Sequence, residues 1–239
     1  MLTILLIVFA LIAFTTYTLR RAYLDLKADY TQQTKMVKFV FYTLILWLLL
    51  TAVLSIGGYY MNFKYFPPRV FVLGIFPPLV LTIVLCFSKA FTKILQRVPP
   101  VWLIKMQSFR IAMEVMLWVA FLGDLLPFQM TFQGFNMDII AGITALFAGN
   151  IFFRKGRFFK IETVIWNIFG IFLLINIVFI TTISTPAPFR VFMNEPSSAI
   201  IASFPFIWIP TFIVPYALAL HIFSIRQVFI KNLQPFEES

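Results

Sequence analysis

Charged residues are scarce in this sequence. They make up 12% of the 239 residues, whereas hydrophobic residues make up 61%, and the mean hydropathy is +0.94. Soluble domains hold about 25% charged and about 45–50% apolar residues, so the composition excludes an ordinary soluble domain. The sequence therefore predicts a protein that is embedded in the lipid bilayer and crosses it several times.

Histidine and cysteine occur once each, as His221 and Cys86. A single cysteine cannot form an intrachain disulfide, and one histidine with no nearby cysteine cannot build a zinc site. Haem with two axial histidines is excluded for the same reason. The last apolar segment, residues 198–225, contains no lysine and so offers no Schiff base for retinal. We expect no metal and no other cofactor.

Motifs of familiar enzyme classes are also absent. The chain has no H-E-x-x-H and no G-x-S-x-G. The sequence "FLGD", which ends at Asp124, lacks the fuller G-x-G-D pattern of intramembrane proteases. An enzyme is therefore the least favoured class of function.

Long apolar runs are what the chain has in quantity. Crossing a bilayer takes about 20 mostly apolar residues in a helix, and no run shows the alternation of a barrel strand. We predict an all-α, polytopic membrane protein, a seven-transmembrane-helix bundle that forms one domain over residues 1–239. The predicted helices lie at about 1–19, 39–57, 70–88, 107–126, 136–153, 163–183 and 198–225. The first has no basic n-region and no cleavage site, so we expect it to be retained.

The basic residues are distributed unequally between the two predicted ends of this bundle. Of the 19 lysines and arginines, all but Lys64, Arg69 and Arg190 fall after the first, third and fifth helices or near the C-terminus. Cytoplasmic loops hold such an excess, which predicts an outer N-terminus and an inner C-terminus. Because the net charge of +10 is concentrated in these connections, we expect a lipid bilayer as partner and no nucleic acid.

The connection "SKAFTKILQRVPP" has the pattern of a helix on the membrane surface. Lys89, Lys93 and Arg97 recur every four residues, and apolar side chains fill the opposite face. The three basic residues either bind anionic lipid or belong to a helix extension whose side chains reach the interface.

Two predicted helices contain proline at membrane depth: Pro77 and Pro78 in one, Pro210 and Pro215 in the other. Each proline removes an intrahelical hydrogen bond and bends the helix. The freed carbonyls could bind a ligand or allow a hinge, as in transporters with broken helices; the alternative is a static kink that helps the bundle pack.

Small residues in 136–153, namely Gly142, Ala145 and Gly149, allow another helix to come close. That helix belongs either to the same chain or to a second copy in a homo-oligomer.

The strongest polar candidates are Gln107, Arg110, Glu114 and His221. An ionised acid in hydrocarbon is costly, so Glu114 should be protonated, paired or in a water-filled cavity. Arg110 lies one helical turn before it and is the predicted partner. We expect the four side chains to converge in the inner half of the bundle, either as a ligand or proton-relay site or as an ion pair that fixes packing.

A polar outer loop precedes the helix predicted at 136–153. Asp124, Gln133, Asn136 and Asp138 mark it, and apolar residues alternate with polar ones before Gly134. This pattern favours a short extended flap or a re-entrant turn at the outer mouth of the bundle, which either covers a vestibule or lies at the headgroups.

Three stretches carry a resemblance: "MTFQGFNMDIIAGITA", "PPRVFVLGIFPP" and the segment ending in "PYALALH". They resemble segments of uncharacterised bacterial seven-span membrane proteins over about half of the chain. The resemblance implies a multi-pass protein of the bacterial cytoplasmic (inner) membrane and implies no activity. From the residues themselves we favour a transporter or binding protein for a small or lipid-like ligand. A structural, assembly or sensory membrane subunit is the alternative.

Overall fold

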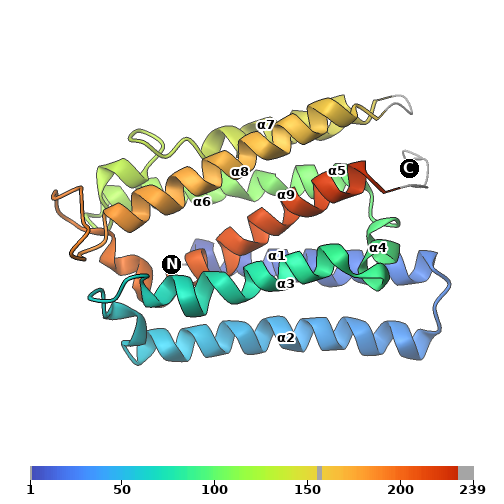
Figure 1. Ribbon diagram of the computed structural model, residues 1–239, viewed down its shortest axis with the longest axis horizontal. Coiled ribbons are helices and arrows are strands. Elements are labelled where there is room, and N and C mark those ends of the chain that lie inside the picture. Colours follow the sequence, from blue (N-terminus) through green and yellow to red (C-terminus); the bar gives the residue numbers. More distant parts are fainter. Residues whose placement is uncertain (1, 155–157, 231–239) are drawn as a thin grey trace.

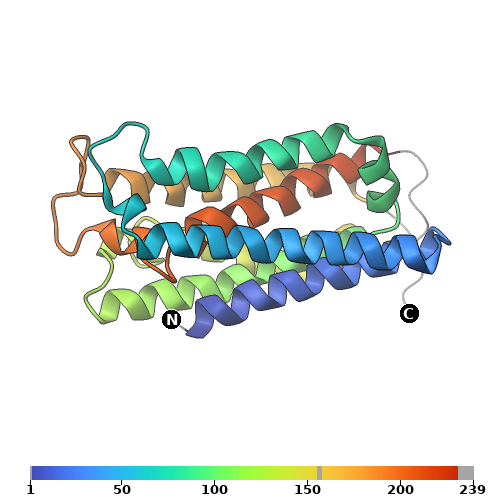
Figure 2. The ribbon, with the colours of Figure 1, turned by 90° about the horizontal axis from the view of Figure 1, so that it is seen from below.

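Helices make up the regular structure of the chain. The computed structural model describes residues 2–154 and 158–230, and within them no strand occurs. Helical rods lie side by side along the long axis, and the connections gather at the two ends (Figures 1 and 2). The all-α class predicted from the sequence is confirmed.

The first two helices are longer than predicted. They are α1 (Leu2–Asp25) and α2 (Tyr30–Ile56), so the basic residues assigned to their connection largely extend the helices themselves. The turn between them is short because Lys27 takes a left-handed conformation, with φ 52°, and the Asp29 carboxylate caps α2 by accepting from Thr31 N at 3.1 Å. Such a cap satisfies a backbone donor that the helix leaves unpaired.

The third rod bends sharply where the surface-helix pattern begins. The loop before it contains the short 3-10 turn η1 (Tyr59–Met61). The rod itself consists of the π-helix η2 (Phe71–Ile75) and α3 (Phe76–Phe87), and it turns by 84° into α4 (Lys89–Leu95). The Ser88 hydroxyl caps α4. Lys89 and Lys93 are exposed and Leu95 is buried, as the amphipathic pattern predicts.

The middle rods carry the central polar residues. They are α5 (Pro100–Lys105), the 3-10 turn η3 (Met106–Ser108), α6 (Phe109–Leu122), α7 (Ile139–Phe152) and α8 (Lys160–Ile183), with the 3-10 turn η4 (Phe128–Met130) before α7. The segment predicted as one helix over 107–126 therefore starts earlier, at 100, and ends before Gly123.

The last predicted helix, 198–225, is wrong over its first half. Residues 198–208 form the 3-10 turn η5 (Ser198–Ala202) and an irregular stretch, and the rod begins with the π-helix η6 (Ile209–Ile213) before α9 (Val214–Val228). Pro205 and Pro210 lack the N–H groups that a regular helix needs here. These residues pack across one end of the bundle instead.

Both proline-containing segments thus deviate from a regular α-helix where prolines were predicted to break it. η2 ends two residues before Pro77, and η6 contains Pro210 and ends two residues before Pro215. The two π-helices touch: a Cβ added to Gly74 would lie 2.5 Å from Thr211 Cγ2. Only glycine permits this approach.

Two tryptophans tie η6 to α2. Pro215 has no N–H, so the carbonyl of Thr211 loses its α-helical donor; the Trp47 indole donates to that carbonyl at 2.9 Å. In return the Trp208 indole donates to the carbonyl of Leu48 in α2 at 3.1 Å. The break is therefore stabilised by its neighbour.

The small residues of α7 serve contacts inside the chain. A Cβ on Gly142 would meet Ile111 of α6 at 2.9 Å, and one on Gly149 would meet Lys105 of α5 at 3.1 Å. Of the two alternatives for this face, the described residues use the intramolecular one.

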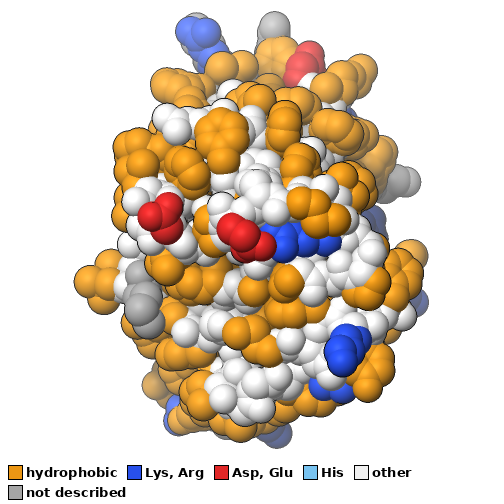
Figure 3. All heavy atoms as spheres, turned by 90° about the vertical axis from the view of Figure 1, so that its left-hand side faces the viewer, with side chains coloured by type: hydrophobic (Ala, Val, Ile, Leu, Met, Phe, Trp, Pro, Cys, Tyr) orange, Lys and Arg blue, Asp and Glu red, His pale blue; other side chains and the backbone are white. Residues whose placement is uncertain are grey.

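Several helices are long and apolar enough to cross a membrane. Within 2–154 and 158–230 these are α1, α2, α8 and Ile209–Val228, and a fifth if the bent pair Phe71–Phe87 and Lys89–Leu95 counts as one span. Figure 3 looks onto the end that holds the loops 57–70, 123–138 and 184–208, where charged side chains are sparse among hydrophobic and uncharged ones. The described basic connections lie at the opposite end (Figure 1).

Candidate functional site

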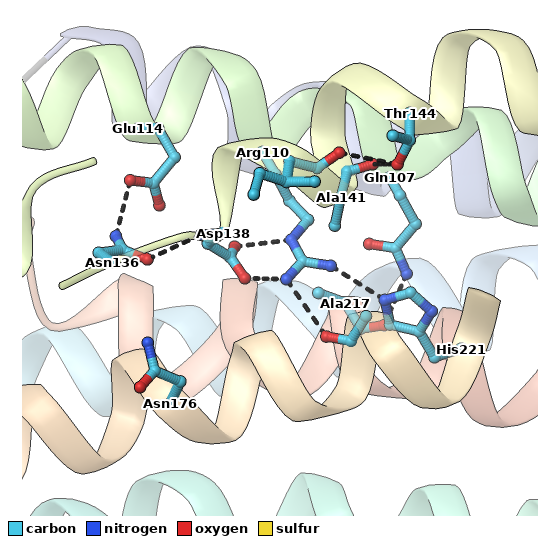
Figure 4. Close-up of polar contacts among 12 residues, drawn as sticks. Gln107, Arg110, Glu114, Asn136, Asp138, Ala141, Thr144, Asn176, Ala217 and His221 are labelled. Carbon is cyan, nitrogen blue, oxygen red and sulfur yellow. Dashed lines mark hydrogen bonds and ion pairs between the residues drawn. The ribbon is translucent and has the colours of Figure 1, made fainter. Parts of the chain in front are cut away.

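A buried ion pair lies at the centre of the bundle. Arg110 of α6 is 1% exposed, and Asp138, which directly precedes α7, is 5% exposed. The guanidinium Nε donates to Asp138 Oδ2 at 2.6 Å, and Nη2 donates to Oδ1 (Figure 4). This two-point contact matches the planar fork of arginine to a carboxylate.

Local sequence places Asp138 against Arg110. Gly142 lies one turn after Asp138, and its missing side chain lets α7 pack closely on α6, since a Cβ there would lie 3.3 Å from Arg110 Cβ. The Asp138 carboxylate makes no capping bond to its own helix. It is committed to Arg110, while the positive end of the α7 dipole favours its charge.

His221 of α9 continues the network on the other side of Arg110. Arg110 Nη1 lies 3.0 Å from His221 Nε2, and because arginine can only donate, Nε2 must accept. Nδ1 then carries the proton and donates to Asn167 Oδ1 at 2.8 Å. The geometry assigns a neutral histidine with the proton on Nδ1.

Asn167 of α8 completes this branch. Its amide nitrogen donates to the Thr163 carbonyl at 2.8 Å and to Ser224 Oγ of α9 at 2.9 Å. Gly170, one turn along, accepts from Arg110 Nη2 at 3.4 Å, and a Cβ there would lie 2.2 Å from the His221 ring. Glycine is required for the ring to sit between α8 and α9.

Glu114 belongs to a separate branch. It is 2% exposed, and Asn136 Nδ2 donates to its Oε2 at 2.6 Å. The same amide group donates to the Met130 carbonyl at 3.1 Å, and its oxygen accepts from Asp138 N at 3.1 Å. The predicted Glu114–Arg110 ion pair is wrong: among the described residues Glu114 makes no ion pair. Asp138 accepts hydrogen bonds from both Nε and Nη2 of Arg110, so this two-point contact is not available to Glu114.

The predicted cluster is therefore brought together only in part. Arg110 and His221 are in contact, whereas Glu114 reaches the network through Asn136 and Asp138 and does not contact His221. A proton relay between Glu114 and His221 would have to pass Arg110, which has no acceptor. Gln107 donates to the Ala217 carbonyl at 2.9 Å and links η3 to α9, while its own side-chain oxygen has no partner among the described residues.

The four residues predicted for the outer vestibule also lie in two different environments. Asp124 and Gln133 are exposed, as expected for a loop, but Asn136 is fully buried with Asp138. Of the two predicted forms, the loop takes that of a turn and not that of an extended flap. It turns through η4 and folds back into the bundle, where Gln129 Nε2 donates to Ser184 Oγ at 2.9 Å.

A small apolar cavity lies where the two broken helices meet. Its volume is about 80 Å³, and the residues lining it include Phe71, Ile75, Pro210, Thr181, Thr185 and Ser198. No charged side chain lines it. Of the hinge candidates, Pro210 lines the cavity. The other three, Pro77, Pro78 and Pro215, lie at the start of the α-helices that follow the two π-helices.

Some network residues were not foreseen. Asn167, Ser224 and Gly170 are not among the site residues predicted from the sequence. The available signal was spacing: Thr163, Asn167 and Gly170 fall three or four residues apart on one face of α8, the pattern of a buried polar stripe. Among the described residues, no group of three or more His, Cys, Asp or Glu side chains is placed to hold a metal ion.

The fold and site together define an all-α bundle with a buried arginine–aspartate network and several helices of membrane-spanning length. The chain belongs to the family described as domain of unknown function (DUF8737), whose model matches residues 67–229. The match covers the rods from η2 to α9 and every residue of the network. No curated protein and no solved structure matches the chain.

Proposed function

We propose that this chain is a seven-span protein of a bacterial cytoplasmic membrane that binds a lipid-like ligand at its broken helices. Besides the four or five spans above, α5, η3 and α6 run on from residue 100 to 122, and α7 lies alongside them. Successive rods alternate in direction (Figures 1 and 2), and the basic connections share one end. This arrangement supports an outer N-terminus and an inner C-terminus.

The cavity between η2 and η6 carries the ligand proposal. Its walls are apolar with a few hydroxyl groups, from Thr181, Thr182, Thr185 and Ser198, and with no charge. Such a lining fits an acyl chain with a neutral, hydroxyl-bearing head better than an ion or a charged metabolite.

The volume points the same way. Pockets for drug-sized ligands measure about 300–1,000 Å³, far more than the 80 Å³ found here. A water-soluble ligand must be enclosed, whereas an acyl chain can insert a short stretch and leave the rest in the bilayer. Ile75 and Val178 line the cavity and are only half buried, so the proposed route for the acyl chain passes between them.

Photolabelling tests this proposal. We expect a diazirine-bearing monoacylglycerol, added to the purified protein in nanodiscs, to label peptides from α8 and η6. Val178→Phe should fill the cavity and reduce this labelling, while Ile175→Phe, on the lipid-facing side of the same helix, should not. Equal labelling of both variants and the unmodified protein would contradict a specific site.

A structural membrane subunit is the second candidate function. The observation in its favour is the His221 branch, in which each polar atom of Asn167 and both ring nitrogens have partners. A closed network of this kind cross-links α6, α7, α8 and α9 without any ligand.

A further inference from the structure

We propose that Glu114 is a proton-binding site linked to occupancy of the cavity; this deepens the proposed function and rests on it. Two buried carboxyl groups, Glu114 and Asp138, face one guanidinium, and Arg110 is committed to Asp138, His221 and the Gly170 carbonyl. His221 is neutral in the tautomer that Arg110 imposes. The site therefore holds one more acid than it holds cations.

Nothing else among the described residues balances that acid. The groups that face Glu114 are Arg110 on its own helix and Asp138 before α7, with His221 beyond Arg110, and α1 packs against α6 with apolar side chains. A lone carboxylate inside a membrane is expensive. A proton on Glu114 removes the unbalanced charge.

Asn136 connects this carboxyl group to the cavity. One amide N–H is bonded to Glu114 and the other to the Met130 carbonyl, at 2.6 and 3.1 Å. Met130 lines the cavity together with Leu117, which lies three residues after Glu114 on the same helix. An acyl chain that displaces Met130 would therefore shift the Asn136 amide group, which donates a hydrogen bond to Glu114.

A donor for the charged form is close at hand. The Trp118 indole N–H is buried and has no partner among the described residues, and Trp118 lies one helical turn from Glu114, where side chains are neighbours. On release, the carboxyl O–H bond breaks, the electron pair stays on the carboxylate and the proton passes to water.

The test combines photolabelling with infrared spectroscopy. The neutral monoacylglycerol probe has no group to titrate, so any pH dependence of labelling arises in the protein. We expect labelling of cavity peptides to change about fivefold or more across the titration, the lower range of typical coupling between sites. In Glu114→Gln the labelling should be independent of pH; Glu162→Gln, an exposed acid at the start of α8, is the control and should titrate like the unmodified protein.

The infrared spectrum of the unmodified protein tests the proton directly and does not depend on a variant that folds. It should contain a carbonyl-stretch band of a protonated carboxyl group that disappears at high pH. Lack of this band would overturn the proton site. Labelling that is strong but equal at every pH would overturn the linkage and leave the ligand proposal standing, whereas lack of labelling at every pH would overturn the proposed function itself.

Discussion

The Arg110 side chain holds three other helical elements to α6, since it binds Asp138 before α7, the Gly170 carbonyl of α8 and His221 of α9. Attraction within a buried ion pair roughly offsets the cost of removing both charges from water, but removing one partner leaves the other uncompensated. Stability therefore depends less on forming the pair than on never leaving it incomplete.

Asp138→Asn should consequently destabilise the protein by about 3–5 kcal/mol, the cost of an unpaired buried charge. Thermal or chemical denaturation in detergent would measure the loss. The matched control is Glu195→Gln, which removes the exposed ion pair with Arg190 and should leave the transition unchanged. Equal effects of the two substitutions would show that the Arg110 charge is balanced in another way.

The single histidine makes its tautomer directly measurable. Labelling the protein with ¹⁵N-histidine gives signals from His221 alone, because the chain contains no other histidine. We expect a protonated Nδ1 and an unprotonated Nε2, as the bond from Arg110 requires. The opposite tautomer, or a doubly protonated ring at neutral pH, would contradict the Arg110–His221 contact.

Sequence reasoning identified Arg110, Glu114 and His221 as interior polar groups because charge inside an apolar run is costly wherever it lies. It paired Arg110 with Glu114 because the only geometry available was the spacing along one helix. The partner in the structure, Asp138, is brought to Arg110 by a loop that folds inward. Gly142 contributes because it allows α7 to pack closely on α6. Contacts of this tertiary kind leave no periodic signal.

At the scale of elements, the two π-helices are held by different means. η6 is bonded to α2 through Trp47 and Trp208, whereas η2 packs against η6 with Gly74 in close contact with Thr211. The break in η6 thus has its lost hydrogen bond replaced, which supports a static kink there.

Trp47→Phe should cost about 1–3 kcal/mol, since the Thr211 carbonyl is left buried without a donor. Denaturation of the purified protein measures this. Trp118→Phe makes the same change where the indole N–H has no partner among the described residues, so it should be neutral or slightly stabilising. If both variants lose the same stability, ring size and not hydrogen bonding is responsible.

Gly74→Ala should destabilise the protein by about 1–3 kcal/mol, the usual cost of overpacking, because the new methyl group meets Thr211 Cγ2 at 2.5 Å. Adding Thr211→Ser removes that methyl group and keeps the hydroxyl that donates to the Ile207 carbonyl. Stability should recover in the double variant. If the stability changes of Gly74→Ala and Thr211→Ser simply add in the double variant, the contact between these two residues is not the source of the strain.

At the scale of the whole molecule, the two ends differ in charge, and this asymmetry predicts orientation. In a Cys86→Ala background, a cysteine at Lys64 should react with a membrane-impermeant maleimide added to intact cells, and a cysteine at Lys27 should react only after lysis. Both positions are exposed. Reversed accessibility would invert the topology; the basic residues Lys155, Arg157 and Lys231, which entered the charge count, lie outside the described residues.

The positions of the apolar rods could be predicted because the length and the hydropathy of an apolar segment can be read directly from its residues. Their ends could not: α1 and α2 continue through basic residues, since Lys and Arg are good helix formers. Residues 198–208 are apolar, but Pro205 within them and Pro210 just after them prevent a regular helix, and hydropathy does not register this effect.

The indole bonds between α2 and η6 also have a mechanical consequence. Trp47 of α2 donates to Thr211 of η6, and Trp208, directly before η6, donates to Leu48 of α2, so we expect η6 to stay fixed to α2. α3 is attached differently: Arg226 Nε donates to the Cys86 carbonyl at its far end, at 3.2 Å, and at the cavity end no hydrogen bond among the described residues joins η2 to η6. If the cavity widens, we therefore expect η2 to move away from η6 while the end of α3 near Cys86 stays attached to α9.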